Sequence, residues 1–199
     1  MSDISPHFRL DWMPLADPAA IVSGPHVRFT LLTSQLIRFE YSPADVFEDR
    51  PSQVFWYRRQ PVPKYEVQRQ GSRIEITTAH LHLIYDGPGP FTPESLSITL
   101  RGTSTVWHYG DPDRANLLGT ARTLDGAAGH TALEPGLLSR AGWTVVDDSA
   151  TLVFDAEGWL EARKRPANQD FYFFGYGQDY RQCLRDYCAV VDEARRIRH

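Results

Sequence analysis

The sequence predicts an all-β protein: an antiparallel two-sheet β-sandwich followed by one C-terminal α-helix. From residue 25 onward, hydrophobic and polar residues alternate along about ten short segments, as they do in half-buried strands. Turn-forming residues separate these segments at short intervals. From residue 178 onward the hydrophobic spacing changes to nearly 3.6 residues, which indicates a helix. Many short strands before a single terminal helix are typical of a sandwich.

The pattern divides the chain into three parts. Residues 1–24 predict an irregular lead-in, because Pro6, Pro14 and Pro18 interrupt any regular element. The sandwich is expected over residues 25–177. The C-terminal helix region is expected over residues 178–199, with the helix itself over about 178–192.

Two hairpins are the clearest predicted elements. Residues 27–31 and 37–41 alternate on both sides of a turn at 33–35, and a second pair of strands flanks the turn at 70–72. The other expected strands lie at 54–57, 81–85, 98–100, 106–109, 143–146, 152–154 and 171–174.

The predicted helix has a hydrophobic stripe and an acidic residue at its start. The stripe consists of Tyr180, Cys183, Leu184, Tyr187 and Val191. Asp179 favours a helix that begins next to it. The two cysteines, Cys183 and Cys188, lie five residues apart and point to different faces, so we expect no disulfide between them.

Composition excludes several classes of protein. The 199 residues are enough for one large β domain or two small ones, and 42% hydrophobic residues suit a folded core. A net charge of −4 gives no electrostatic reason to bind nucleic acid or an anionic membrane. The N-terminus has no apolar run of signal-peptide length, and no segment approaches the roughly 18 apolar residues of a membrane span. We expect a cytoplasmic protein.

A long loop interrupts the strand pattern at residues 110–142, where Gly, Ala, Asp, Pro and Thr dominate and no period holds. A loop of this length in a compact domain is usually functional. It therefore becomes the first place to look for a binding site.

Three segments in and after this loop carry a family resemblance. They read NLLGTARTLDG at 116–126, LEPGLLSRAGWTVVDDS at 133–149 and DFYFFGYGQDY at 170–180. In this order and spacing they resemble the N-terminal domain of family 31 glycoside hydrolases, the α-glucosidase and α-xylosidase family, over roughly residues 25–191. The resemblance implies a galactose-mutarotase-like sandwich that precedes a (β/α)8 barrel. Leu118 departs from it, because the family turn has a second glycine there.

The resemblance also implies that the catalytic carboxyl pair lies on the barrel. Only 25 residues (199 − 174) follow Phe174, whereas a barrel takes about 250. We therefore expect a non-catalytic domain that supports the barrel and lends a loop to the substrate pocket, with no catalytic residue, cofactor or metal of its own. The expected partners are the missing barrel, an α-linked carbohydrate bound weakly, and a second copy of the chain that contacts the helix and residues 171–176.

Four residues have the chemistry to touch a sugar in that pocket, namely Asp125, Arg140, Trp143 and Asp147. An aromatic ring covers the apolar face of a sugar, and arginine or carboxylate groups hydrogen-bond its hydroxyls. The competing interpretation makes Trp143 a core residue. Asp147 and Asp148, being adjacent in a strand, point to opposite sides, and the competing interpretation places them in a polar turn.

Three other functions compete with this hypothesis. A free-standing carbohydrate-binding module would hold a glycan on the sandwich itself. A mutarotase-like enzyme would need an acid and a base, for which His108, His130 and Glu134 are the candidates. His80 and His82 share a strand face and form a possible metal pair, but no third ligand accompanies them, which favours ordinary surface histidines.

Overall fold

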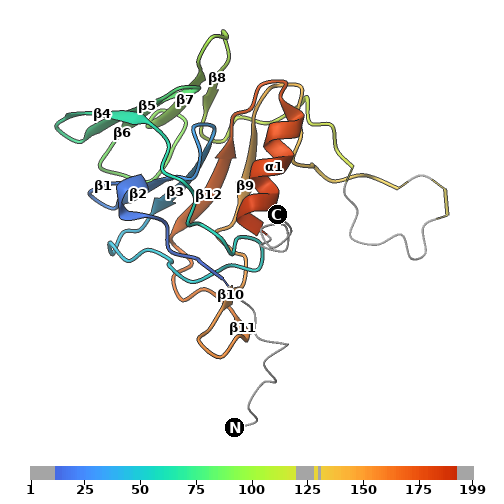
Figure 1. Ribbon diagram of the computed structural model, residues 1–199, viewed down its shortest axis with the longest axis horizontal. Helices are drawn as coiled ribbons and strands as arrows, with labels where there is room; N and C mark the ends of the chain where they lie inside the picture. Colours follow the sequence, from blue (N-terminus) through green and yellow to red (C-terminus); the bar gives the residue numbers. More distant parts are fainter. Residues whose placement is uncertain (1–11, 120–127, 130, 192–199) are drawn as a thin grey trace.

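The computed structural model describes residues 12–119, 128–129 and 131–191, and it confirms the predicted fold class. Within this part of the chain, two five-stranded sheets have the strand orders β1-β2-β3-β12-β9 and β4-β5-β6-β7-β8, and all neighbouring strands are antiparallel (Figure 1). We call them the first and the second sheet.

Most elements follow one another with short connections, and the two long ones are residues 42–64, between β3 and β4, and the loop before β9. The first sheet consists of β1 (Ile21–Gly24), β2 (Val27–Leu31), β3 (Leu36–Tyr41), β12 (Gln169–Phe174) and β9 (Thr144–Asp147). The second sheet consists of β4 (Tyr65–Gln70), β5 (Arg73–Thr78), β6 (Leu81–Asp86), β7 (Leu96–Leu100) and β8 (Val106–His108). The remaining elements are the 3-10 turn η2 (Pro18–Ala20), the small hairpin β10 (Val153–Phe154) and β11 (Leu160–Glu161), and the helix α1 (Tyr180–Val191).

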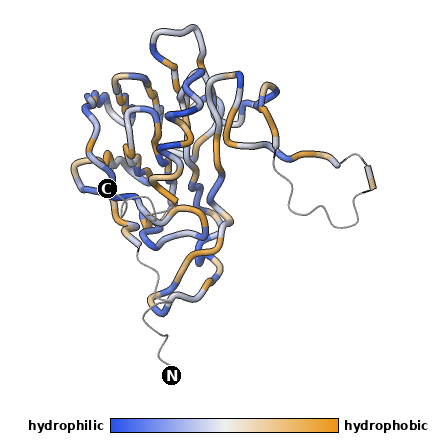
Figure 2. Tube along the Cα trace, turned by 45° about the vertical axis from the view of Figure 1, so that its right-hand side comes forward, coloured by the Kyte–Doolittle hydropathy of each residue, from blue (hydrophilic) through white to orange (hydrophobic). Residues whose placement is uncertain are grey.

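Alternating side chains of both sheets build the core between them. Phe29, Phe39 and Phe171 face inward from three neighbouring strands of the first sheet, and the register places them side by side. The rings of Phe39 and Phe171 stack with centroids 4.8 Å apart. From the second-sheet side, Tyr85 and Trp107 pack against this row. Hydrophobic and hydrophilic residues succeed one another along the trace in Figure 2, as this packing requires.

Both predicted hairpins are present. Leu31 pairs with Ile37 and Gln70 pairs with Arg73, so the two turns lie where the sequence places them. The first strand, however, begins at Ile21, before the position that the pattern indicates. Its residues Ile21–Gly24 pair with Val27–Thr30 as a further edge of the sheet.

The strand expected at 54–57 is wrong. The backbone N–H groups of Trp56 and Tyr57 donate to the carbonyl of Val190 at the end of α1, 3.0 Å away, and not to a neighbouring strand. Phe55 is buried and stacks on Tyr172. The apolar run therefore covers the sheet. A covering segment needs the same apolar residues as a buried strand, so composition does not distinguish the two.

The outer face of the first sheet is covered by α1 together with this segment. Cys183 and Val190 are buried against Phe174 and Phe55, and Tyr187 packs beside them. Leu184 was expected on the buried stripe but is 45% exposed. This helix is 12 residues long, and no helix in the described ranges is both long and apolar enough to cross a bilayer.

Side chains and loops satisfy both ends of α1. Asp179 accepts a hydrogen bond from the backbone of Gln182 at 3.0 Å, which makes it the N-cap that the sequence indicates. At the other end the carbonyl of Ala189 accepts from the side chain of Gln60. Cys183 and Cys188 are both free thiols, as expected.

Replacing Asp179 should test how far the capping supports the helix. Asp179→Ala should lower the free energy of unfolding by about 1 kcal/mol, because the N–H of Gln182 loses its acceptor. Asp179→Ser keeps an acceptor and is the matched control. Urea unfolding followed by circular dichroism gives both values, and equal losses in the two variants would contradict the assignment.

Candidate functional site

A small hollow lies where the second and third resemblance segments meet, between β9, the end of the long loop and the start of α1. Its empty volume is about 180 Å³, including space open to solvent. Ten residues line it: Leu137, Ser139, Gly142, Trp143, Thr144, Phe174, Tyr176, Gly177, Tyr180 and Cys183. Most of that volume lies between packed atoms or in open solvent, and the space that remains is about enough for one water molecule, so this hollow does not accommodate a sugar ring.

Two glycines bring the walls of the hollow together. The N–H of Gly177 donates to the carbonyl of Gly142 at 2.8 Å, which joins the second resemblance segment to the third. Gly142 has φ +83°, and a Cβ on it would lie 3.1 Å from the Cα of Gly177. The close approach depends on glycine at position 142, because a Cβ on Gly177 would meet no atom within 4 Å.

Asn116 closes the base of the long loop. Its side-chain amide donates to the carbonyl of Gly136 at 2.9 Å, and its side-chain oxygen accepts from the N–H of Gly136 at 2.8 Å. The backbone of Leu117 bonds to Leu138, and that of Arg140 to Ala115. The first resemblance segment is therefore fixed to the second at the neck of the loop.

Leu118 shows why the family turn carries a glycine at this position. Its φ is +57°, in the left-handed region that costs a side-chain-bearing residue roughly 1–2 kcal/mol. The side chain is 46% exposed, so its contacts compensate little for this strain. The departure noted in the sequence is thus a site of local backbone strain.

Leu118→Gly should raise the free energy of unfolding by about 0.5–1 kcal/mol, because glycine adopts this conformation without strain. Leu118→Ala is the control: it removes the same exposed side chain but keeps the Cβ, so it should give no gain. The measurement is chemical unfolding of the three proteins under one set of conditions. A gain in the alanine variant as large as that in the glycine variant would disprove the strain.

The polar groups in the hollow suit binding better than acid–base or nucleophilic chemistry. The hydroxyl of Thr144 is buried without a hydrogen-bond partner among the described residues, so it is available to a ligand or a water. Burial, with Asp186 and Asp179 nearby, raises the pKa of the Cys183 thiol to about 12, which leaves it unreactive. Burial and the hydrogen bond to Asp186 also raise the pKa of Tyr176.

The structure does not gather the three described residues of the predicted site in one place. Trp143 lines the hollow, but it is only 9% exposed and packs in the core beside Trp107 and Phe173. Arg140 is exposed at the neck of the loop, and its guanidinium has no bonding partner within the described ranges. Asp147 lies at the far end of β9, about 13 Å from Trp143 at 3.3 Å per residue.

Asp125 lies outside the described residues. Contact of any of the four with a sugar stays a prediction, although the burial of Trp143 favours the core interpretation weighed for it. Thr144 and Tyr180 line the hollow too and were not foreseen, because nothing in a sequence marks a strand threonine or a helix tyrosine as facing the same space.

The other candidates from the sequence are not gathered into a site. His80 bonds to Ser34, and His82 to Glu75. No group of three metal-ligating side chains occurs in the part of the chain that is described. His108 lies on β8 with its ring 3.7 Å from Asp111, and His130 is outside the described residues.

The aromatic run 171–176 does not offer the surface for self-association that we expected. Its strand, β12, lies between β3 and β9, and the run is buried on both sides. Of the two surfaces expected to self-associate, only the helix keeps a large exposed apolar side chain, Leu184, in the part of the chain that is described. Self-association itself stays a prediction.

A cluster of buried charges on the outer face of the first sheet is the second place where a site could lie. Arg38 binds Asp170 through two hydrogen bonds of 2.8 and 2.7 Å. Arg163 bridges Asp170 and Asp148 at 2.8 and 2.7 Å. Most of these charges are paired with one another, so the cluster holds the β12 end of the sheet, but Oδ1 of Asp148 is buried with no hydrogen-bond partner among the described residues.

The pKa values of Asp148 and Asp170 are shifted in opposite directions. Burial and the negative charge of Asp170 raise the pKa of Asp148 to about 6, against the pull of Arg163. Burial also acts to raise the pKa of Asp170, but Arg38 and Arg163 outweigh it and lower the value to about 2. Relative to an unfolded value of about 3.9, the folded protein holds the Asp148 proton more tightly and the Asp170 proton less tightly.

The contribution of Asp148 to stability should therefore fall as the pH rises from about 4 to about 6, whereas that of Asp170 should be lost as the pH falls from about 4 to about 2. As the pH rises from 4 to 6, the free energy of unfolding of Asp148→Asn should increase relative to that of the native protein by on the order of 1–2 kcal/mol. Asp147→Asn, which alters the exposed neighbour, is the control. Urea unfolding at several pH values gives the differences, and identical pH responses of the two variants would contradict the assignment.

Comparisons with known proteins give a distant likeness in shape. No known family model matches the chain, and no curated protein matches it. Two solved structures of a GH31 dextranase from Flavobacterium johnsoniae, one complexed with glucose and one a mutant complexed with isomaltotriose, each match with a TM-score of 0.49 and 15% identity. The match covers 83% of this chain and 25% of the dextranase, so this chain spans about a quarter of that protein's length.

Proposed function

We propose that this chain is the non-catalytic β-sandwich domain of an α-glycosidase of the family 31 type, and that it supports the barrel and lends a loop to the substrate pocket. The observation that carries the proposal is the meeting of the three resemblance segments at one edge of the first sheet. They are separated in the sequence but joined in the fold.

Three sets of contacts make this edge one unit. Asn116 ties the first segment to Gly136 in the second. Residues 144–147 of the second segment pair with 171–174 of the third as β9 and β12. Gly177 closes the unit through its bond to Gly142. Specific residues of the three segments therefore contact one another. These contacts explain why the three motifs occur together, which supports the family interpretation.

The same unit gives the loop its proposed role. The hydrogen bonds between Asn116 and Gly136 hold the two ends of the loop together, and the described residues 131–135 extend away from the sheet edge (Figure 1). Loops fixed to a rigid scaffold in this way commonly carry binding residues. Arg140, with its free guanidinium at the neck, is the described residue placed to hydrogen-bond a sugar hydroxyl.

The direct test is to read the coding DNA on the 3′ side of codon 199. We expect sequence for a barrel of about 250 residues in one of the three frames. Unrelated genes in all three frames would contradict the proposal.

The purified 199-residue chain should release no nitrophenol from aryl α-glucosides or α-xylosides at high protein concentration, because the proposed carboxyl pair belongs to the barrel. A hydrolytic activity that disappears on replacing a single acidic residue of this chain would overturn the non-catalytic assignment.

Titration with glucose, xylose and maltose should show dissociation constants of millimolar or weaker, which correspond to a binding free energy on the order of −4 kcal/mol, because the proposed substrate pocket is completed only by the barrel. Amide chemical shifts should move chiefly between Ser139 and Thr144, and Arg140→Ala should reduce these shifts. Leu133→Ala, at another exposed loop position, is the control. Micromolar affinity at this edge would favour a free-standing carbohydrate-binding module instead.

A further inference from the structure

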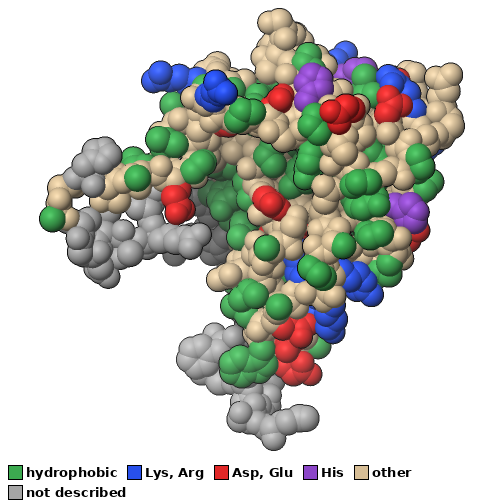
Figure 3. Space-filling model, turned by 180° about the vertical axis from the view of Figure 1, so that it is seen from behind, with side chains coloured by type: hydrophobic (Ala, Val, Ile, Leu, Met, Phe, Trp, Pro, Cys, Tyr) green, Lys and Arg blue, Asp and Glu red, His purple; other side chains and the backbone are tan. Residues whose placement is uncertain are grey.

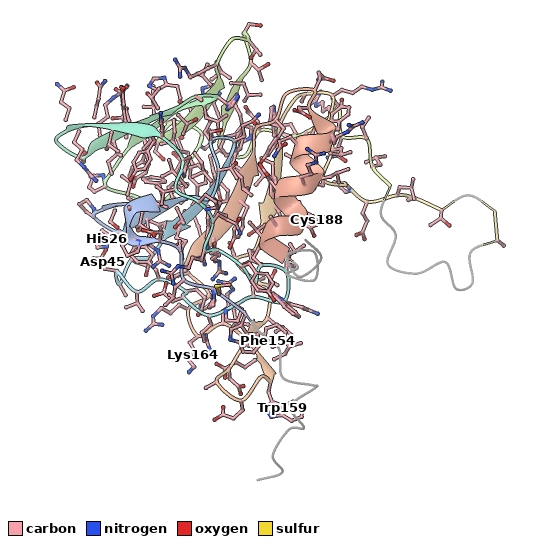
Figure 4. The ribbon with its side chains drawn as sticks, viewed as in Figure 1. His26, Asp45, Phe154, Trp159, Lys164 and Cys188 are labelled. Atoms are coloured by element: carbon pink, nitrogen blue, oxygen red, sulfur yellow. The ribbon has the colours of Figure 1, made fainter. Side chains whose placement is uncertain are left out.

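A second surface feature stands apart from the hollow, at the tip of the β10–β11 hairpin. Trp159 is 66% exposed, whereas tryptophan is usually highly buried. Figure 4 places it at the lower end of the molecule, with Phe154 above it on the side of the protein body. A large ring in this position gains little from burial, so its presence needs another explanation.

The turn that carries Trp159 is rigidly hydrogen-bonded. The side chain of Asp155 accepts from the backbone N–H groups of Trp159 at 2.7 Å and Glu157 at 3.0 Å. The backbone of Asp155 also donates to the carbonyl of Trp159 at 2.9 Å. The backbone that bears the indole is thus fixed before any ligand arrives, which lowers the entropy cost of binding.

The hairpin is itself anchored to the body of the domain. The N–H of Gln53 donates to Leu152 at 2.8 Å, and that of Phe154 donates to Pro51 at 2.9 Å. An ion pair joins Arg50 to Glu161 on β11. The tip is therefore a rigid extension of the sandwich.

An aromatic base supports the hairpin. Trp12 lies against Phe154 with centroids 5.2 Å apart, and Trp56 lies against the same ring at 5.5 Å. Trp12 also borders Gly158, next to Trp159. Three rings thus pack inward beneath the hairpin, and the indole of Trp159 is the one that is left largely uncovered.

We propose that Trp159 is the stacking platform of a carbohydrate-binding site, with the apolar face of one pyranose ring on the indole and sugar hydroxyls donating to Glu157. Glu157 is exposed in the same turn, and its carboxylate has no bonding partner within the described ranges. Figure 3 shows acidic side chains next to hydrophobic ones at this end of the molecule. A ligand with an apolar face and a hydroxyl edge matches that pairing.

The size of the surface favours a small ligand over a protein. A tryptophan side chain buries at most about 250 Å², so the exposed part of this one measures on the order of 165 Å². Leu152 and Leu160 of the same hairpin are 39% and 43% exposed, but with them the apolar patch is still well below the roughly 800 Å² per partner of a stable protein interface. Proline-rich peptides, the other common ligands of exposed aromatics, bind in grooves between rings, whereas this ring stands at a tip.

Affinity electrophoresis in native gels containing soluble starch, dextran or xylan tests the platform. At least one polysaccharide should retard the native chain, and Trp159→Ala should weaken this binding by about tenfold or more, because the stacked surface is lost. Trp159→Phe should retain part of it. Leu184→Ala, which removes an exposed apolar side chain of α1, is the matched control and should behave as the native chain.

The outcomes separate the alternatives. Unchanged retardation of Trp159→Ala, or no retardation of the native chain by any of the three polysaccharides, would overturn the proposal. Binding of a proline-rich peptide in their place, seen as a shift of the Trp159 indole N–H resonance, would overturn the ligand class. The platform requires no barrel, so these results leave the reading of the downstream gene as the separate test of the proposed function.

Discussion

The pairing of β12 in the middle of the first sheet is the constraint on which the rest of the structure depends. Its inward side chains, Phe171 and Phe173, belong to the core between the sheets. Its outward side chains, Tyr172 and Phe174, belong to the cluster beneath α1. A single six-residue strand therefore joins both hydrophobic layers, and a register shift by one residue would exchange its two faces.

The buried charges follow from the same strand. Asp170 is on its outward face, where it binds Arg38 from β3 and Arg163 from the loop between β11 and β12. A buried carboxylate is tolerated only with such partners, since an unpaired charge in the interior costs several kcal/mol. The cluster thus fixes the relation of β12 to β3 and to the chain after β11, and it leaves Asp148 as the group that carries the cost of burial at neutral pH.

Two regions of the molecule differ in how binding chemistry is presented. The hollow beside β9 is enclosed by backbone that two glycines bring close, and its free polar group, the Thr144 hydroxyl, is buried. The Trp159 hairpin instead presents a broad ring on a stiff turn in solvent. The first has room for about one water molecule, whereas the second is open to a ligand that binds from solution.

The sequence by itself determined the fold class, the two hairpins, the cap at Asp179 and the helix, because alternation, turn residues and capping are local signals. It also placed Asp147 and Asp148 on opposite faces by parity alone, as the structure shows. Only the tertiary structure decided that residues 54–57 cover a sheet and that the aromatic run is internal. It likewise decided that Trp143 belongs to the core while Trp159 does not, since burial depends on which distant segments pack over a residue, and no local pattern records that.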